Sequence, residues 1–119
     1  MAYDGYRVKL AGHPEVYVVI DNAKHHVPDP ATYNNLFENW TDIQEIPAAD
    51  FNAVPTGLAL TSGAVLAKGS APEVYLITNG VRRHVMSPET MDKYDFGWNK
   101  VVLTPDAVIN GIPFGPTVR

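Results

Sequence analysis

The fold is decided by a stretch that occurs twice, first as Pro14-Glu15-Val16-Tyr17-Val18-Val19-Ile20-Asp21-Asn22 and again 58 positions later as Pro72-Glu73-Val74-Tyr75-Leu76-Ile77-Thr78-Asn79-Gly80. In the first copy, five consecutive apolar residues rich in β-branched side chains are followed by turn-forming residues. Such a run predicts a strand that is covered on both faces.

The residues that end each stretch predict a tight β-hairpin. Asn79-Gly80 favours a type I′ turn, which needs a positive φ angle at both central positions, and Asp21-Asn22 is a weaker form of the same signal. The return strands are then 24–27 and 82–85, each beginning with a basic residue. This hairpin, used twice, is the organising unit of the chain.

The duplication extends beyond the hairpin, because residues 5–61 align with residues 63–119 without a gap. The residues of the first copy that recur unchanged in the second are Gly5, Pro14, Glu15, Val16, Tyr17, His26, Val27, Pro30, Thr32, Trp40, Pro47, Ala49, Asn52, Pro55 and Gly57. A fixed period of this kind indicates a repeat architecture. We therefore expect residues 1–119 to form a single domain made of two repeats, 5–61 and 63–119.

Each repeat is expected to run strand, strand, strand, helix, strand and helical turn. The first strand covers 6–10 or 64–68, and the fourth covers 43–46 or 101–103. Pro47 and Pro105 then begin the helical turns, the second of which Thr104 is expected to cap.

The main helix of each repeat has a clear start signal. Asp29-Pro30 and Ser87-Pro88 each place an N-cap acceptor before a proline at the first helical position. In the first repeat the spacing of Tyr33, Leu36, Phe37 and Trp40 predicts one apolar helix face, whereas Gly97 is expected to end the second helix a turn earlier.

The predicted fold class is α+β, with two tandem β-hairpin-plus-helix repeats related by pseudo-twofold symmetry and a mainly antiparallel sheet. One repeat alone would bury only about 60% of its unfolded surface, so a shared core is expected. The favoured arrangement packs both helices on one joined sheet. The alternative is an open array whose exposed ends pair with a second chain, which gives a homodimer.

Composition excludes several classes of function. The net charge of −4 argues against a nucleic-acid partner, which normally requires a basic surface. The chain has no cysteine, so disulfides, thiolate metal sites and cysteine nucleophiles are absent. No apolar run approaches the ~20 residues of a membrane span, and residues 1–5 lack the features of a signal peptide. We expect no membrane insertion.

The second repeat carries the clearest resemblance to a known family. Residues 63–85, with the segment Val74-Tyr-Leu-Ile-Thr-Asn-Gly-Val-Arg-Arg-His-Val85 followed by Ser87-Pro88, are similar to a tandem module of extracellular microbial proteins. That module has a V-Y-L-I-x-x-G-x-x-R-x-I hairpin, a proline-capped helix and a terminal I-P-x-G. In the first repeat, Lys24-His25-His26 replaces the basic pair and the residue after it, and the turn glycine is missing.

The resemblance covers nearly the whole chain. The module occurs on secreted hydrolases, on cell-surface proteins and as small separate proteins. It implies an extracellular or cell-surface location and an accessory role toward glycans or cell-wall polymers. It supplies no ligand-binding residue, so the candidates below rest on the sequence itself.

The repeated aromatic and acidic residues are the first candidates for a binding site. Trp40 and Trp98 are either sugar-stacking platforms or core anchors, and the core interpretation is favoured. Glu15 and Glu73 either accept hydrogen bonds from sugar hydroxyls or pair across the hairpin with Lys24 or with Arg82 and Arg83. The pairing interpretation is favoured there too.

The histidines do not predict a metal site. His25 and His26 are neighbours on a strand and therefore point to opposite faces, and no H-x-H or HExxH spacing is present. No nucleophile elbow, phosphate-binding loop or dinucleotide fingerprint is present either. We expect neither an enzyme nor a cofactor.

The hypothesis from the sequence is a non-catalytic, lectin-like protein with two related sites for a carbohydrate or a cell-envelope glycopolymer. The candidate ligand-binding residues are Glu15, His26, Asp29, Trp40, Glu73, Arg83, His84 and Trp98. The main alternative is a structural or oligomerising repeat without a small ligand. A minor one is an enzyme inhibitor or a toxin-like effector.

Overall fold

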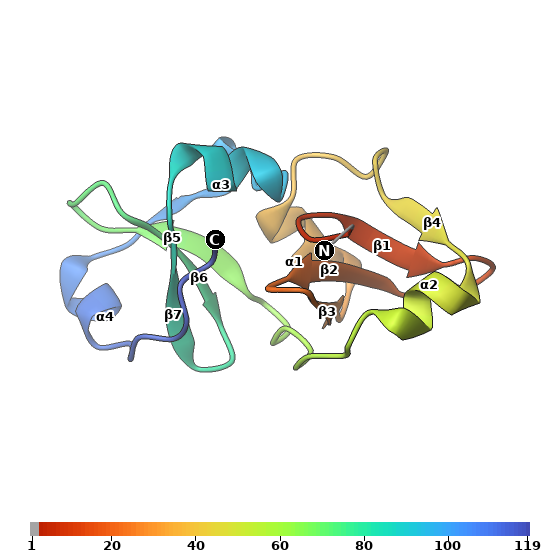
Figure 1. The fold of residues 1–119 in the computed structure, drawn as a ribbon. Helices are drawn as coiled ribbons and strands as arrows, with labels where there is room; N and C mark the ends of the chain where they lie inside the picture. The colour runs from red at the N-terminus through yellow and green to blue at the C-terminus, as the bar shows by residue number, and fades with distance from the viewer. Residues whose placement is uncertain (1–2) are drawn as a thin grey trace.

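The computed structural model describes residues 3–119, and the chain has an α+β fold in which two similar units lie side by side (Figure 1). The first unit contains β1 (Arg7–Leu10), β2 (Val16–Ile20), β3 (Ala23–Val27), α1 (Pro30–Leu36), β4 (Gln44–Ile46) and α2 (Ala48–Ala53). The second contains β5 (Val65–Lys68), β6 (Val74–Thr78), β7 (Val81–Val85), α3 (Pro88–Lys93), the 3₁₀ turn η1 (Trp98–Lys100), β8 (Val102–Leu103) and α4 (Asp106–Asn110). The element order predicted for each repeat is confirmed.

The strands form two separate sheets of four strands each. The strand orders are β3-β2-β1-β4 and β7-β6-β5-β8, so the two sheets have the same topology. Pairing is antiparallel except between β1 and β4 and between β5 and β8. The joined sheet expected from the sequence is therefore wrong, although the mainly antiparallel pairing is confirmed.

Both hairpins close with two-residue turns. Asp21 and Asn22 have φ angles of 52° and 64°, and Asn79 and Gly80 have φ angles of 54° and 76°. These positive values are those of the predicted type I′ turn. In the first hairpin, β2 has both faces covered, because Val18 and Val19 are fully buried in different apolar clusters.

The two main helices begin as predicted but end elsewhere. The Asp29 carboxylate accepts a hydrogen bond from the Thr32 amide at 2.8 Å, and the Ser87 hydroxyl accepts one from the Thr90 amide at 3.2 Å. Helix α1 ends at Leu36, before Trp40. Helix α3 ends at Lys93, and the left-handed residue that follows is Asp95, with a φ of 56°, rather than Gly97.

The short helices α2 and α4 follow Pro47 and Pro105, each of which occupies the N-cap position. The predicted cap by Thr104 is wrong, because its hydroxyl donates to the Val102 carbonyl instead. The Asp106 carboxylate fixes this end of the second unit, since it accepts hydrogen bonds from the Ser70 amide and hydroxyl at 2.9 and 2.6 Å.

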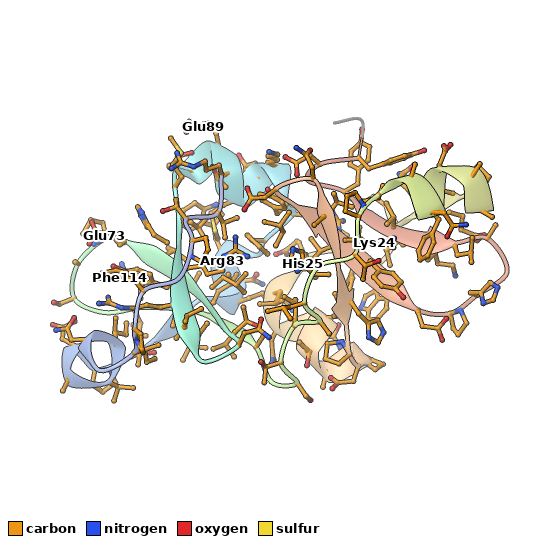
Figure 2. The ribbon with its side chains drawn as sticks, turned by 60° about the horizontal axis from the view of Figure 1, so that its bottom comes forward. Lys24, His25, Glu73, Arg83, Glu89 and Phe114 are labelled. Carbon is orange, nitrogen blue, oxygen red and sulfur yellow. The ribbon has the colours of Figure 1, made fainter. Side chains whose placement is uncertain are left out.

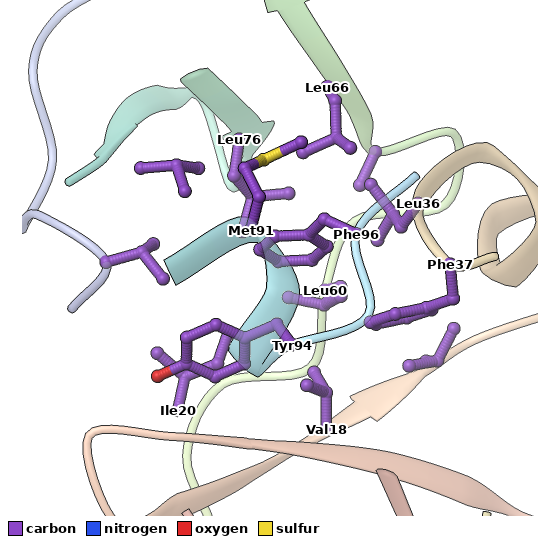
Figure 3. Close-up of a cluster of buried hydrophobic side chains, with 14 of the residues drawn as sticks. Val18, Ile20, Leu36, Phe37, Leu60, Leu66, Leu76, Met91, Tyr94 and Phe96 are labelled. Atoms are coloured by element: carbon purple, nitrogen blue, oxygen red, sulfur yellow. The ribbon is translucent and has the colours of Figure 1, made fainter. Parts of the chain in front are cut away.

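One apolar core is shared by the two repeats (Figure 3). The contributors that Figure 3 labels from the first repeat are Val18, Ile20, Leu36, Phe37 and Leu60, and those from the second are Leu66, Leu76, Met91, Tyr94 and Phe96. At its centre Phe37 stacks on Phe96 with 5.5 Å between ring centroids, and the two residues also form an antiparallel bridge. The expectation of a shared core is confirmed.

The helix of each repeat packs on the first turn of the other repeat. From α1, the Thr32 hydroxyl accepts a hydrogen bond from the Gly63 amide at 2.9 Å, and Asn35 donates to the Ala64 carbonyl at 3.2 Å. From α3, Lys93 pairs with Asp4 at 2.7 Å. Asp4 is the counterpart of Ser62 under the 58-residue offset, so the exchange is reciprocal, as pseudo-twofold symmetry requires.

Arg7 adds a polar link between the repeats. Arg7 lies in β1 and is only 3% exposed. Its guanidinium pairs with Asp42 and, at 3.1 Å, with Asp95 of the second repeat. Because both partners are acidic and Arg7 is buried, loss of this cation would leave repelling carboxylates at the repeat interface.

We predict that Gly80→Ala lowers the free energy of unfolding by about 1 kcal/mol, because an alanine is strained at a φ of 76°. Nothing approaches the new Cβ atom within 4 Å, so the loss comes from the backbone alone. Gly111→Ala is the matched control, because its φ is −80° and its new Cβ would meet only ordinary contacts. Equal losses in urea denaturation would contradict this interpretation.

We also predict that Arg7→Met lowers the free energy of unfolding by about 2 kcal/mol, because it leaves Asp95 without its cation. Lys93→Met removes a more exposed pair with Asp4, and its cost should stay below about 1 kcal/mol. Thermal and urea unfolding of the two variants would compare these costs. A larger loss for Lys93→Met would show that the Arg7 pairs do not hold the repeats together.

Candidate functional site

Each repeat has an open cleft between the open end of its hairpin and the start of its main helix. The first cleft, about 340 Å³, is lined by Pro14, Glu15, Val16, His26, Val27, Pro28, Asp29, Pro30, Tyr33 and Trp40. The second cleft, about 510 Å³, is lined by Lys68, Pro72, Glu73, Val74, His84, Val85, Met86, Ser87, Pro88, Met91 and Trp98. With the exception of Lys68, the second set is the first set shifted by 58 positions.

The hairpin and the helix cap together build each cleft. In the first repeat, Val16 pairs with Val27 and Tyr17 pairs with His26, which closes the open end of the hairpin. Glu15 precedes β2, while Asp29 follows β3 and caps α1. The local signals that fix the hairpin and the helix start therefore also bring Glu15, His26 and Asp29 to one cleft.

Trp40 forms one wall of the first cleft and is 46% exposed. Its indole ring lies on the buried Tyr33 ring, with 3.9 Å between centroids and 31° between planes. Its Nε1 atom donates a hydrogen bond to the Asn34 side-chain oxygen at 2.8 Å. The indole is thus held in place from one side while much of its surface stays open.

Trp98 holds the equivalent position in the second cleft and is 54% exposed. It lies at the start of η1, and the residue at the position of Tyr33 is Met91. The interpretation of Trp40 and Trp98 as core anchors is therefore wrong for both. The helical spacing of Trp40 led to the wrong prediction, because the apolar face of α1 ends at Phe37 and the chain leaves the helix before it reaches Trp40.

Glu15 and Glu73 are both exposed at the edges of their clefts. Within residues 3–119, neither carboxylate has a hydrogen-bond or ion-pair partner. The predicted pairing with the basic return strand is wrong, because those cations bind backbone carbonyls. Lys24 donates to the Val54 and Phe51 carbonyls at 2.5 and 3.0 Å, and the Arg82 Nε atom donates to the Ile112 carbonyl at 2.8 Å.

Arg83 does not lie in the second cleft. Its Nε atom donates to the Pro116 carbonyl at 2.7 Å, and its guanidinium pairs with Asp21 of the first repeat at 3.0 Å. Figure 2 shows Arg83 toward the middle of the molecule, facing His25, while Glu73 lies at the outer end. The prediction that Arg83 shares a site with Glu73, His84 and Trp98 is therefore wrong.

Arg83 instead lines a third pocket, of about 310 Å³, between the two hairpins. Its lining includes the equivalent pairs Asp21 and Asn79, Ala23 and Val81, His25 and Arg83, and Leu58 and Pro116. The pocket thus lies on the pseudo-twofold axis. The sequence does not predict this pocket, because only the relative placement of the repeats brings these residues together.

His26 and His84 contribute an imidazole ring to each cleft. The His26 ring is tilted against Tyr17 with 5.3 Å between centroids, and the His84 ring is tilted against Tyr75 with 5.8 Å between centroids. His25 turns the other way, and its Nδ1 atom lies 2.7 Å from the Leu58 carbonyl oxygen. The predicted opposite orientation of His25 and His26 is confirmed.

Asp29 combines a structural and a chemical role. One carboxylate oxygen caps α1, and the other accepts a hydrogen bond from the Ser62 hydroxyl at 2.6 Å. The hydrogen bonds from Ser62 and Thr32 lower the pKa of Asp29 below its ordinary value of 3.8. Asp29 therefore keeps its negative charge at the edge of the first cleft well into the acidic range.

The described chain offers few other site types. Across residues 3–119, no group of three histidine, aspartate or glutamate side chains is placed to hold a metal ion. The longest helix among the same residues has seven residues, and none of these helices has the length and apolar character needed to cross a membrane.

Comparison of the chain with models of protein families, with curated proteins and with solved structures finds no match.

We predict that Asp29→Asn flattens the dependence of stability on pH below pH 4. Because the folded-state pKa of Asp29 lies below 3.8, its charge contributes stability above that value, and the contribution is lost as the pH falls through the folded-state pKa. Asparagine still caps the helix but does not titrate. Urea unfolding at pH 7, 5, 4 and 3 would measure the difference.

The control for this prediction is Asp92→Asn, since the Asp92 carboxylate accepts no hydrogen bond from the described residues. Its stability should follow the wild-type curve in shape. A steep acid loss that persists unchanged in Asp29→Asn would show that protonation of Asp29 is not its cause.

Proposed function

We propose that the protein is a non-catalytic, lectin-like binding protein whose two clefts each recognise a sugar unit of a carbohydrate or a cell-envelope glycopolymer. The observation that carries the proposal is the repetition of one constellation. Each cleft combines a half-exposed tryptophan, a carboxylate that has no partner among residues 3–119 and an imidazole. The proposed location is extracellular or at the cell surface, as the family resemblance implies.

The geometry of the first cleft suits a pyranose ring. The C–H face of a sugar packs well on an aromatic ring, and Trp40 offers such a ring already oriented by Tyr33 and Asn34. A fixed side chain loses little freedom when a ligand binds. Glu15 and His26 add polar atoms at the rim for the hydroxyl groups of the sugar.

Two clefts also suit a polymeric ligand. Single open sugar sites bind weakly, and linking two of them in one chain raises avidity when both engage the same polymer. The constellation recurs in both halves, which fits two related binding sites better than one asymmetric catalytic centre. This pattern supports a binding role over an enzyme.

The alternative function is an oligomerising repeat, and one feature favours it. Strand β8 lies at a sheet edge, and its side chains Val102 and Leu103 are exposed, Leu103 by 76%. The equivalent strand β4 carries the polar residues Gln44 and Glu45. An apolar edge strand is able to pair with a second chain and give a homodimer.

We predict that Trp40→Ala and Trp98→Ala each weaken binding to an immobilised polymer by about tenfold or more, because each removes one stacking platform. A glycan array would identify the ligand, and titration of the variants would measure the loss. Tyr6→Ala is the matched control, since Tyr6 is 48% exposed but lines neither cleft.

Unfolding curves separate loss of binding from loss of fold. Binding that falls only in proportion to the unfolded fraction would contradict a contact role for the tryptophans. An empty glycan array together with a tight dimer in sedimentation at several concentrations would favour the oligomerising alternative instead.

A further inference from the structure

The two clefts are formed by equivalent segments of the two repeats, but the side chains that line them differ in charge. Asp29 and Glu15 give the first cleft two carboxylates, and apart from His26 its described lining has no basic side chain. In the second cleft, Ser87 replaces Asp29, and Lys68 joins Glu73 in the lining. Lys68 occupies the position of Leu10 in the first repeat. The first cleft is therefore acidic, whereas the lysine offsets the carboxylate in the second.

The two clefts also differ in the aromatic side chains that line them. In the first cleft, the Trp40 and Tyr33 rings pack against each other at a tilt of 31°, and the second cleft has Met91 in place of the tyrosine. The negative face of an aromatic ring attracts an ammonium group, most strongly for tryptophan. An aromatic wall next to two carboxylates favours a cationic ligand over a neutral or anionic one.

The carboxylates of the first cleft have capacity for such a ligand. Glu15 makes no hydrogen bond or ion pair within residues 3–119, and it is exposed. Asp29 uses one lone pair of each oxygen for Thr32 and Ser62, and an ionised carboxylate has about four acceptor positions. Both carboxylates therefore keep free acceptor positions in the lining of the cleft that Trp40 also forms.

We propose that the first cleft selects a sugar unit bearing a protonated amine, such as a glucosamine residue, whereas the second cleft accepts neutral sugar units. This inference rests on the proposed carbohydrate-binding function and names the ligand class of its first site. An N-acetylated unit lacks the positive charge, so the first cleft binds it less tightly. A glycopolymer with free amino groups is then the ligand that uses both the aromatic wall and the carboxylates.

The test compares three oligosaccharide series of equal length, made of glucosamine, N-acetylglucosamine and glucose, by calorimetric titration of the intact chain at low salt. We expect glucosamine oligomers to bind more tightly than the other two series, by a factor of about ten or more. The preference should shrink in 0.5 M salt, because charge pairs at an open cleft are screened.

Glu15→Gln and Glu73→Gln form a matched pair of variants, since both carboxylates are exposed and lack partners among the described residues. We expect Glu15→Gln to reduce the preference for glucosamine several-fold, because it weakens binding of glucosamine oligomers, where a charge pair is lost, more than binding of glucose oligomers. Glu73→Gln should leave the preference intact. Unfolding curves that match the wild type would show that both variants are folded.

Three outcomes would overturn the inference. Equal or tighter binding of N-acetylglucosamine oligomers would remove the amine selectivity but leave carbohydrate binding in place. An equal effect of Glu15→Gln and Glu73→Gln would place the selectivity outside the first cleft. No binding to any of the three series, nor to a wider glycan array, would remove the proposed function along with this inference.

Discussion

The structure depends on the burial of apolar side chains at the contact between the two repeats. Phe37 and Phe96 stack at the centre, and each main helix packs on the first turn of the opposite repeat. A unit of this size buries only about 60% of its unfolded surface and is marginally stable alone, so the core that both repeats complete adds stability to each of them. The buried Arg7 strengthens the contact, because its charge is matched by carboxylates from both repeats.

Local signals in the sequence predicted the elements well, and long-range relations poorly. The type I′ turns and the Asp29 and Ser87 caps follow from one or two residues each, and all are present. The separation of the two sheets was not predictable in the same way. The sequence of an edge strand does not show whether that strand pairs with the equivalent strand of the other repeat. The buried position of Arg7 was also hidden, since its partner Asp95 is distant in the sequence and is placed only by the fold.

The candidate site shows the same division. Glu15, His26, Asp29 and Trp40 lie together because the hairpin and the helix cap position them locally. Arg83 was misplaced, although it neighbours His84, because adjacent strand residues point to opposite faces and the far face of β7 meets the first repeat. The alternation of side chains along β7 was sufficient to predict that Arg83 and His84 lie on different faces. Only the contact between the repeats shows what Arg83 binds.

The equivalent residues His25 and Arg83 explain how the linings of the two clefts can differ in charge without loss of the fold. His25 and Arg83 direct a ring or guanidinium nitrogen at the carbonyls of Leu58 and Pro116, and these two carbonyls are equivalent under the offset. The return strand therefore anchors the end of each repeat on the face opposite the cleft. The residues on the cleft face do not hold the end of the repeat in place. The change from Asp29 in the first repeat to Ser87 in the second therefore alters the charge of the cleft, while both residues still cap their helices. A duplicated scaffold of this kind can hold two different ligand preferences at equivalent positions, which a single site cannot.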